Sequence, residues 1–174
     1  MQTFLLEDDG ETPNNPILPL LVYRQVVSIG GLADPAAPFE RLFSSHGWGD
    51  GWRNGIYPFL HFHTAAHEVL GIARGRATVE FGGARGRVLT VEAGDVVVLP
   101  AGTGHRRTAA SDDLLVVGAY PRNGSFDQRR PGEIDAAAAR DAIARVPLPE
   151  QDPVEGPAGP LTRLWAVGGG PKVR

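Results

Sequence analysis

Three histidines and one glutamate fall in two short segments of the chain. The first segment, residues 61–75, reads HFHTAAHEVLGIARG and contains His61, His63 and Glu68. Side chains at positions i and i+2 of a strand share a face and lie roughly 6.6 Å apart, so His61 and His63 can converge on one ion. A turn at residues 64–66 lets the next strand bring Glu68 back beside them.

The second segment, residues 94–105, reads GDVVVLPAGTGH and ends on His105. Gly94 turns the chain into an apolar strand, Pro100 ends that strand, and the following glycines permit a tight bend. A third imidazole can therefore arrive from a neighbouring strand. The chain contains no cysteine, so any metal must be held by histidines and carboxylates.

Both segments resemble the two signature motifs of the cupin superfamily, a group of small jelly-roll β-barrels. Eight motif positions match, namely His61, His63, Glu68, Gly75, Gly94, Pro100, Gly102 and His105. One position departs from the family pattern, because an Asn often found four residues after the second-motif histidine is Ala109 here. The stretches HEVLG, VGAYP and PLPxxDPV also resemble a subgroup of small bacterial cupins of unassigned function.

The resemblance implies an all-β fold, a double-stranded β-helix, with one metal ion bound inside the barrel by His61, His63, Glu68 and His105. Three imidazoles and one carboxylate suit a divalent ion of Fe, Mn, Ni, Zn, Co or Cu, and octahedral coordination leaves two positions open. The ligand types do not distinguish these metals. The alternative is that the four residues are ordinary polar residues or a lapsed site.

The two remaining histidines are predicted to lie outside the metal site. His67 precedes Glu68, but position 71 is Gly, so the metalloprotease motif H-E-x-x-H is incomplete. Strand alternation turns His67 away from Glu68, which favours an outer hydrogen bond or a subunit contact. His46 lies at the end of a predicted helix, where a capping role is favoured over chemistry.

The residues before His61 are candidates for a substrate pocket. With a period of two, Arg53, Tyr57 and Phe59 share its inward face if no bulge intervenes. One guanidinium, one phenol and one aromatic wall suit a small polar or anionic organic ligand. Core packing of Tyr57 and Phe59, and solvent exposure of Arg53, are the alternatives. The catalytic residues stay unassigned, with Glu68 and Tyr57 as candidates.

Short strands are predicted from residue 52 to residue 120. Apolar or alternating runs of about four to eight residues are separated there by Gly, Pro and Asp, which is typical of a sandwich or barrel. We expect a single domain over residues 1–174, with a barrel core at about 52–120. An N-terminal arm and helix (1–51) and a C-terminal helix and extended tail (121–174) flank this core.

The flanking segments carry one strand pattern and two helix patterns. The strand is expected at about 20–27, and the helices at about 34–46 and 134–145. The tail beyond the second helix is expected to be extended and docked on the barrel. Because runs such as 96–99 are apolar on both faces, the helices, the arms or a second subunit must cover the barrel. We expect a homodimer.

Composition and charge bear on partners and location. The formal net charge is −3, which gives no electrostatic reason to bind nucleic acid. No apolar run approaches the roughly 18 residues that span a bilayer, and the first residues lack the features of a signal peptide. We therefore expect a cytoplasmic protein whose partner is a small molecule, without nucleic acid or membrane.

Three classes of function remain open. The first is a metal-dependent oxidoreductase of the dioxygenase type, in which the ion binds a small organic molecule and oxygen side by side. The second is a metal-dependent isomerase or lyase, in which the ion polarises a carbonyl or hydroxyl and Glu68, His105 or Tyr57 moves a proton. The third is a non-catalytic module that binds a small molecule or a metal. Fold and ligand set do not fix the reaction, and we expect the first class.

Overall fold

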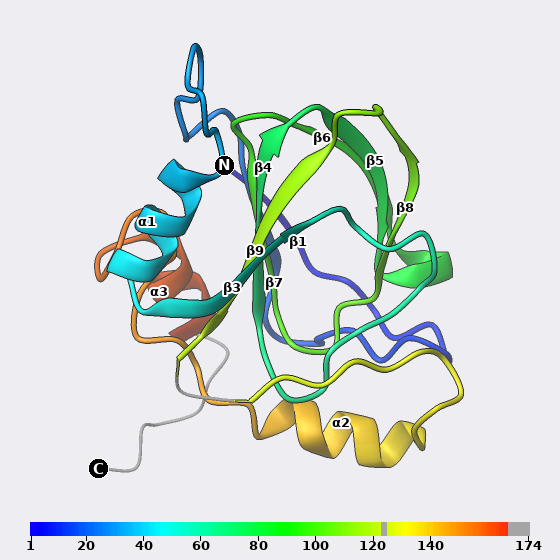
Figure 1. The fold of residues 1–174 in the computed structure, drawn as a ribbon. Helices are drawn as coiled ribbons and strands as arrows, with labels where there is room; N and C mark the ends of the chain where they lie inside the picture. The colour runs from blue at the N-terminus through cyan, green and yellow to red at the C-terminus, as the bar shows by residue number, and fades with distance from the viewer. Residues whose placement is uncertain (123–124, 167–174) are drawn as a thin grey trace.

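The structure, a computed structural model, describes residues 1–122 and 125–166 and contains two antiparallel sheets (Figure 1). The strands of the larger sheet are, in spatial order, β1 Gln2–Phe4, β2 Leu20–Tyr23, β7 Val96–Leu99, β4 Glu68–Arg74, β9 Leu115–Pro121 and β3 Trp48–Asn54. Those of the smaller sheet are β6 Arg87–Glu92, β5 Arg76–Phe81 and β8 His105–Ala110. The sheets face each other as a jelly-roll barrel, which confirms the predicted all-β fold.

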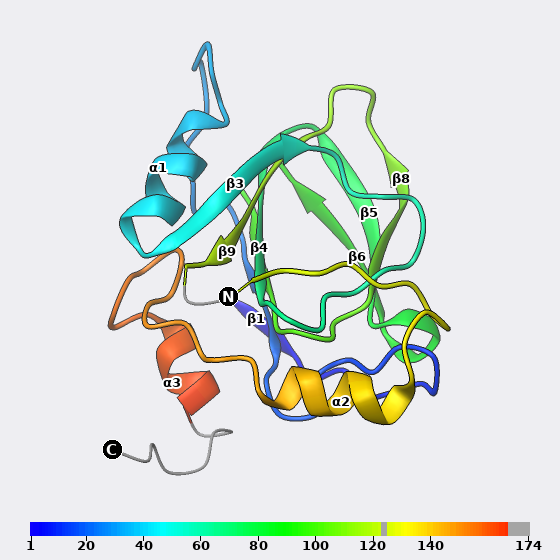
Figure 2. The same cartoon turned by 60° about the horizontal axis from the view of Figure 1, so that its bottom comes forward.

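The helices lie outside this barrel. Helices α1 (Ala37–Ser45) and α3 (Pro160–Ala166) cover the outer face of the larger sheet, while α2 (Ala136–Ala144) crosses the end of the barrel at the bottom of Figure 1 (Figures 1 and 2). A short 3-10 helix, Gly83–Arg85, follows β5. Over the described part of the chain, no helix combines the length and apolarity needed to cross a membrane.

The central strands of the larger sheet contribute to two separate apolar cores. In β7, Val96 and Val98 face the outer core, which includes Phe39, Phe43 and Trp165 from the helices. Val97 and Leu99 alternate with them and face the interior of the barrel. This explains the run that is apolar on both faces, because helices of the same chain cover its outer side. The homodimer stays a prediction, and the covering helices remove one of the reasons for it.

The N-terminal arm belongs to the sheet. Strand β2 pairs with β7, and β1 extends the sheet by pairing with β2. The barrel core predicted at about 52–120 therefore leaves out both strands and the start of β3. Strand β2 ends four residues before the predicted limit of 27, because the next residues turn to the buried Asp95: Arg24 forms an ion pair with it and the Gln25 amide donates to it.

The C-terminal tail docks on the barrel, but it is not extended throughout. It contains α3, which the sequence analysis missed, and Asp152 fixes the segment before that helix. The buried Asp152 carboxylate accepts hydrogen bonds from the Tyr23 hydroxyl and from the backbone amides of Val154, Glu155 and Leu161. A buried carboxylate with several donors is stabilised, so the tail is held against β2.

Candidate metal centre

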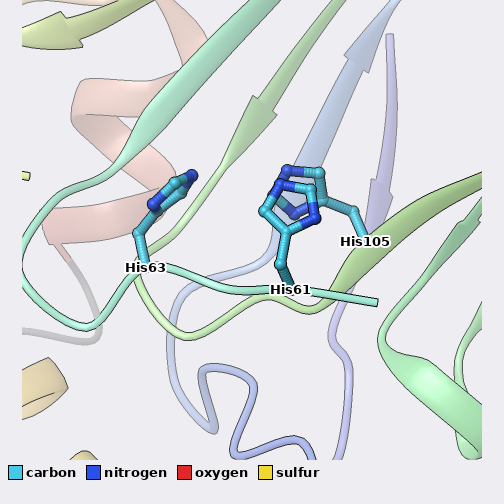
Figure 3. Close-up of side chains that lie close together, drawn as sticks. All are labelled: His61, His63 and His105. Carbon is cyan, nitrogen blue, oxygen red and sulfur yellow. The ribbon is translucent and has the colours of Figure 1, made fainter. Parts of the chain in front are cut away.

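Three imidazoles from two segments meet inside the barrel (Figure 3). His61 and His63 lie on the irregular stretch between β3 and β4, and His105 is the first residue of β8. Two backbone hydrogen bonds join His61 and His105, with N to O distances of 3.2 and 2.9 Å. One ring nitrogen of each histidine lies within 4.8 Å of the other two, and all three residues are buried.

Each imidazole is oriented through its Nδ1 atom. Nδ1 of His61 lies 3.1 Å from the Phe59 carbonyl oxygen, and Nδ1 of His105 lies 3.1 Å from that of Thr103. Nδ1 of His63 contacts the carbonyl oxygen of Asp127. A carbonyl oxygen only accepts, so each Nδ1 carries the hydrogen and each Nε2 is left as the donor of a lone pair. This arrangement is common among metal-binding histidines.

Glu68, the first residue of β4, lies beside two of these histidines, His63 and His105. Its carboxylate is 3 % exposed, and Oε2 lies 3.3 Å from Nε2 of His63 and 3.2 Å from Nε2 of His105. The pairing of β4 with β7 fixes this position, since Glu68 lies opposite Leu99 at the start of the strand. A bend at residues 64–65 precedes β4 and leaves the glutamate beside His63 and His105.

The charges of these residues are strongly coupled. Burial alone would raise the pKa of Glu68, but the neighbouring imidazoles of His63 and His105 hold it well below its usual range. Burial alone would lower the pKa of His63, but the Glu68 carboxylate raises it to about 9. For His61, burial and the nearby His105 lower the pKa to about 3. Without a metal, a proton on His63 therefore balances the buried carboxylate.

The donor set fits a divalent transition metal. Nε2 of His63 and Oε2 of Glu68 are buried, and among the described residues neither atom has a hydrogen-bond partner. Two donor atoms about 2.1 Å from one ion and at right angles to each other lie about 3.0 Å apart. The 3.2 and 3.3 Å separations around Glu68 are close to that value. Four such donors suit the metals predicted from the sequence.

The carbonyl that orients His63 belongs to Asp127, and the side chain of Asp127 holds this part of the chain in place. Its carboxylate accepts hydrogen bonds from the backbone amides of Thr64 and Ala65 and from the Thr64 hydroxyl, at 2.7 to 2.9 Å. It also accepts from Nε of Arg129 at 3.0 Å. These contacts tie the segment after β9 to the segment that carries His63. The sequence analysis missed Asp127, because it lies in a connection without periodicity.

A cavity of about 260 Å³ opens on the candidate ligands. Its aromatic walls come from Trp52, Tyr57, Tyr120 and Phe126, and the amides of Asn54 and Gln128 contribute polar groups. The rings of Tyr120 and Phe126 are stacked, with centroids 4.7 Å apart and planes 2° from parallel. Tyr120 is the fourth residue of the VGAYP stretch in β9, where strand alternation could have revealed its inward direction.

Of the three residues predicted to form a substrate pocket, Arg53 and Tyr57 line the cavity and Phe59 is not among the described residues that line it. Residues 55–60 form no strand, so the period-two argument fails there. Phe59 instead stacks on Tyr57 and lies beneath the guanidinium of Arg130. Arg53 is a lining residue, but its guanidinium pairs with Asp34 and Glu40.

The two remaining histidines lie outside the metal cluster. His67 Nδ1 accepts a hydrogen bond from the Ala101 amide, and its ring packs on Trp165 in the outer core. Burial lowers the pKa of His67 to about 3, so it stays neutral. His46 is the C-cap residue of α1, and its Nδ1 donates to the Pro153 carbonyl oxygen.

The comparisons with known proteins agree with this geometry. A family model described as a cupin domain matches residues 54–117. The chain is also 38 % identical over 166 residues to the uncharacterized protein YjlB of Bacillus subtilis, covering 94 % of this chain and 96 % of that one. The chain belongs to the cupin superfamily. This confirms the resemblance drawn from the eight motif positions.

Similar solved structures overlap with this cupin only in part. An acireductone dioxygenase from Bacillus anthracis, with cadmium in its active centre, is 17 % identical with a TM-score of 0.41, covering 60 % of this chain and 78 % of that one. An oxalate decarboxylase is 23 % identical with a TM-score of 0.38. The overlap covers 46 % of this chain and only 22 % of the decarboxylase. These overlaps bear on neither the substrate nor the reaction of this protein.

The raised pKa of His63 predicts a pH dependence of the metal-free protein. A histidine with a pKa of about 9 when folded and about 6.5 when unfolded contributes stability that is complete below pH 6.5 and is lost as the pH rises through 9. We expect the free energy of unfolding in chelator to fall across this window. Glu68→Gln should flatten the fall, because it removes the charge that raises this pKa. Urea unfolding at several pH values measures the free energy of unfolding of the wild type and of the variant. If this free energy falls as steeply with pH in Glu68→Gln as in the wild type, Glu68 does not raise the pKa of His63.

Proposed function

We propose that this cupin holds one divalent transition metal with His61, His63, Glu68 and His105, and that it oxidises a small organic molecule with oxygen. One observation carries the proposal: three buried imidazoles, each oriented through Nδ1, converge at one end of a cavity, and the Glu68 carboxylate lies 3.2 to 3.3 Å from two of them. A purely structural zinc site is normally closed by its ligands. Here the candidate ligands also line the cavity.

An ion held by these residues would supply Lewis-acid or redox chemistry toward a small molecule and oxygen. The chain supplies the surroundings. Trp52, Tyr120 and Phe126 form aromatic walls that confine a small molecule beside the histidines. The hydroxyl of Tyr120 accepts a hydrogen bond from Nε1 of Trp52 at 3.1 Å. Its own hydrogen therefore remains for donation to Glu68 or to a bound molecule.

A metal-dependent isomerase or lyase is the second candidate, and Tyr120 favours it. Burial and the Glu68 carboxylate raise the pKa of Tyr120 above its usual value, so its phenol stays protonated. A protonated phenol beside a polarised carbonyl can donate a proton to it. In this reading Tyr120 replaces Tyr57 as the proton donor, because 45 % of Tyr57 is exposed whereas Tyr120 is buried next to Glu68.

His63→Ala should abolish stoichiometric metal binding. An ion at 100 times its dissociation constant stabilises the native state by about 2.7 kcal/mol, so added metal should raise the melting temperature of the wild type and leave that of the variant unchanged. Elemental analysis of protein purified without chelator gives the stoichiometry. His67→Ala is the control, because His67 is buried outside the cluster. Equal metal content in wild type and His63→Ala would refute the proposed site.

Asp127→Ala should weaken metal binding by about 10- to 100-fold, as expected when the support of a ligating histidine is lost. Asp127→Asn retains one accepting oxygen and should recover part of the affinity. Asp135→Ala is a matched control, because the Asp135 carboxylate also accepts from two backbone amides, those of Ala137 and Ala138, but caps α2 instead. Competition with a metal-sensitive dye measures the affinities. Equal losses in the Asp127 and Asp135 variants would mean a general loss of stability.

Iron-loaded protein should consume oxygen with a member of a panel of hydroxylated aromatics, thiols and keto acids. An oxygen electrode measures the uptake, and iron-treated His63→Ala is the control because it lacks one ligand. Proton exchange of keto acids or sugars with deuterated water, without oxygen uptake under any metal, would instead support the isomerase or lyase. If neither occurs while a metabolite still binds, the protein is a binding module.

A further inference from the structure

The charge on the lining of the cavity limits the charge of its ligand. Among the described lining residues, Arg53 is the one with a permanent positive charge. Its guanidinium donates two hydrogen bonds to Glu40, at 2.6 and 2.7 Å, and two to Asp34, both at 3.0 Å. Two carboxylates therefore already surround one guanidinium. Arg53 has little capacity left to stabilise a negatively charged group in the cavity.

The other arginines near this segment are also engaged. Nε of Arg107 donates to the Ile56 carbonyl oxygen, and the guanidinium of Arg130 lies 3.9 Å from the centroid of the Phe59 ring. Arg129 pairs with Asp127 at 3.0 Å. In the part of the chain that the structure describes, none of these three lines the cavity. The positive charge available to a ligand must therefore come from the metal centre itself.

The net charge of the metal centre follows from its ligands. This part of the inference rests on the proposed function, in which the site holds a divalent ion. The hydrogen bonds of the three Nδ1 atoms make His61, His63 and His105 neutral ligands. Glu68 contributes one negative charge, so a divalent ion leaves a net charge of +1. Charge buried without a counterion is costly. A ligand with one negative charge neutralises the centre, whereas a second negative charge would meet no free cation.

The shape of the cavity limits the rest of the ligand. Its volume of about 260 Å³ is below the range of roughly 300–1,000 Å³ for drug-sized ligands, and about 150 Å³ is enough for benzene. The flat pair of Tyr120 and Phe126 forms one wall, and Trp52 is joined to it through the Tyr120 hydroxyl. Flat aromatic walls favour a ligand that can stack or present a ring edge.

We infer that the cavity binds a small planar, conjugated monoanion, such as a ring or enol system with one negatively charged oxygen group directed at the metal. The Asn54 and Gln128 amides can receive neutral polar substituents at other positions. Dicarboxylates and phosphorylated compounds are disfavoured, because their second charge would lie against aromatic rings and an arginine that is already paired.

Binding to zinc-loaded protein tests this inference without turnover, since zinc has no redox chemistry. The probes are benzoate, terephthalate with a second carboxylate, uncharged benzamide, and cyclohexanecarboxylate with the same charge but no planar ring. We expect calorimetry to show that benzoate binds at least about tenfold more tightly than each of the others. Benzoate should also change the emission of Trp52, and Trp52→Phe should remove this signal, since Trp48 and Trp165 are buried in the outer core.

The variant Asp34→Asn/Glu40→Gln tests the role of the paired arginine. It releases the Arg53 guanidinium, so the affinity for terephthalate should rise about tenfold while that for benzoate changes by less than about threefold. Exposed ion pairs of this kind contribute little to stability, so the variant should fold. An unchanged affinity for terephthalate would overturn the charge argument.

The outcomes separate the inference from the proposed function. Zinc-loaded protein that binds terephthalate or cyclohexanecarboxylate as tightly as benzoate, or that binds none of the probes, overturns the inference alone. Protein that takes up neither zinc, manganese nor iron overturns the proposed function, and the inference with it. The metal content of the recovered protein, measured after each titration, distinguishes these two cases.

Discussion

A carboxylate buried against two imidazoles, those of His63 and His105, is the constraint on which the site depends. Glu68 is almost fully removed from water, and an isolated charge in that position would be strongly disfavoured. It is tolerated because Nε2 of His63 and of His105 lie 3.2 to 3.3 Å from it. The fold must therefore supply a positive charge at this point, either as a proton on His63 or as a metal ion. The exchange of one for the other couples metal binding to proton release.

In the described part of the chain, the histidines beside Glu68 are oriented at Nδ1 by backbone carbonyls and not by other side chains. The imidazoles of His61, His63 and His105 are each oriented by a carbonyl oxygen. Two of these carbonyls lie two residues before the histidine that they orient, so local chain geometry is enough. The third belongs to Asp127, on a different segment. The orientation of His63 thus depends on tertiary structure, and Asp127 is where the centre is most sensitive to a distant change.

The parts of the site predicted from sequence are those set by local spacing. The motif spacing predicts the pair at 61 and 63, the turn before Glu68 and the arrival of His105 from another strand, although no strand includes His61 or His63. The lining of the cavity could not be predicted in the same way. Residues 55–60 carry no strand, so the alternation that placed Phe59 inward does not hold, and Phe126 and Gln128 come from a connection without periodicity. Arg53 lines the cavity, but its partners Asp34 and Glu40 lie on another segment, and local spacing gives no sign of that pairing.

The segment after β9 links the ligand cavity to the metal ligands. Phe126 and Gln128 line the cavity, while the residue between them, Asp127, holds His63 through its carbonyl and the chain at 64–65 through its carboxylate. Neighbouring residues of this segment thus contact two different parts of the site. A molecule that packs against Phe126 acts on the same short stretch of backbone that orients His63. A shift of that stretch would move the imidazole of His63 relative to Glu68, whose Oε2 lies 3.3 Å from its Nε2.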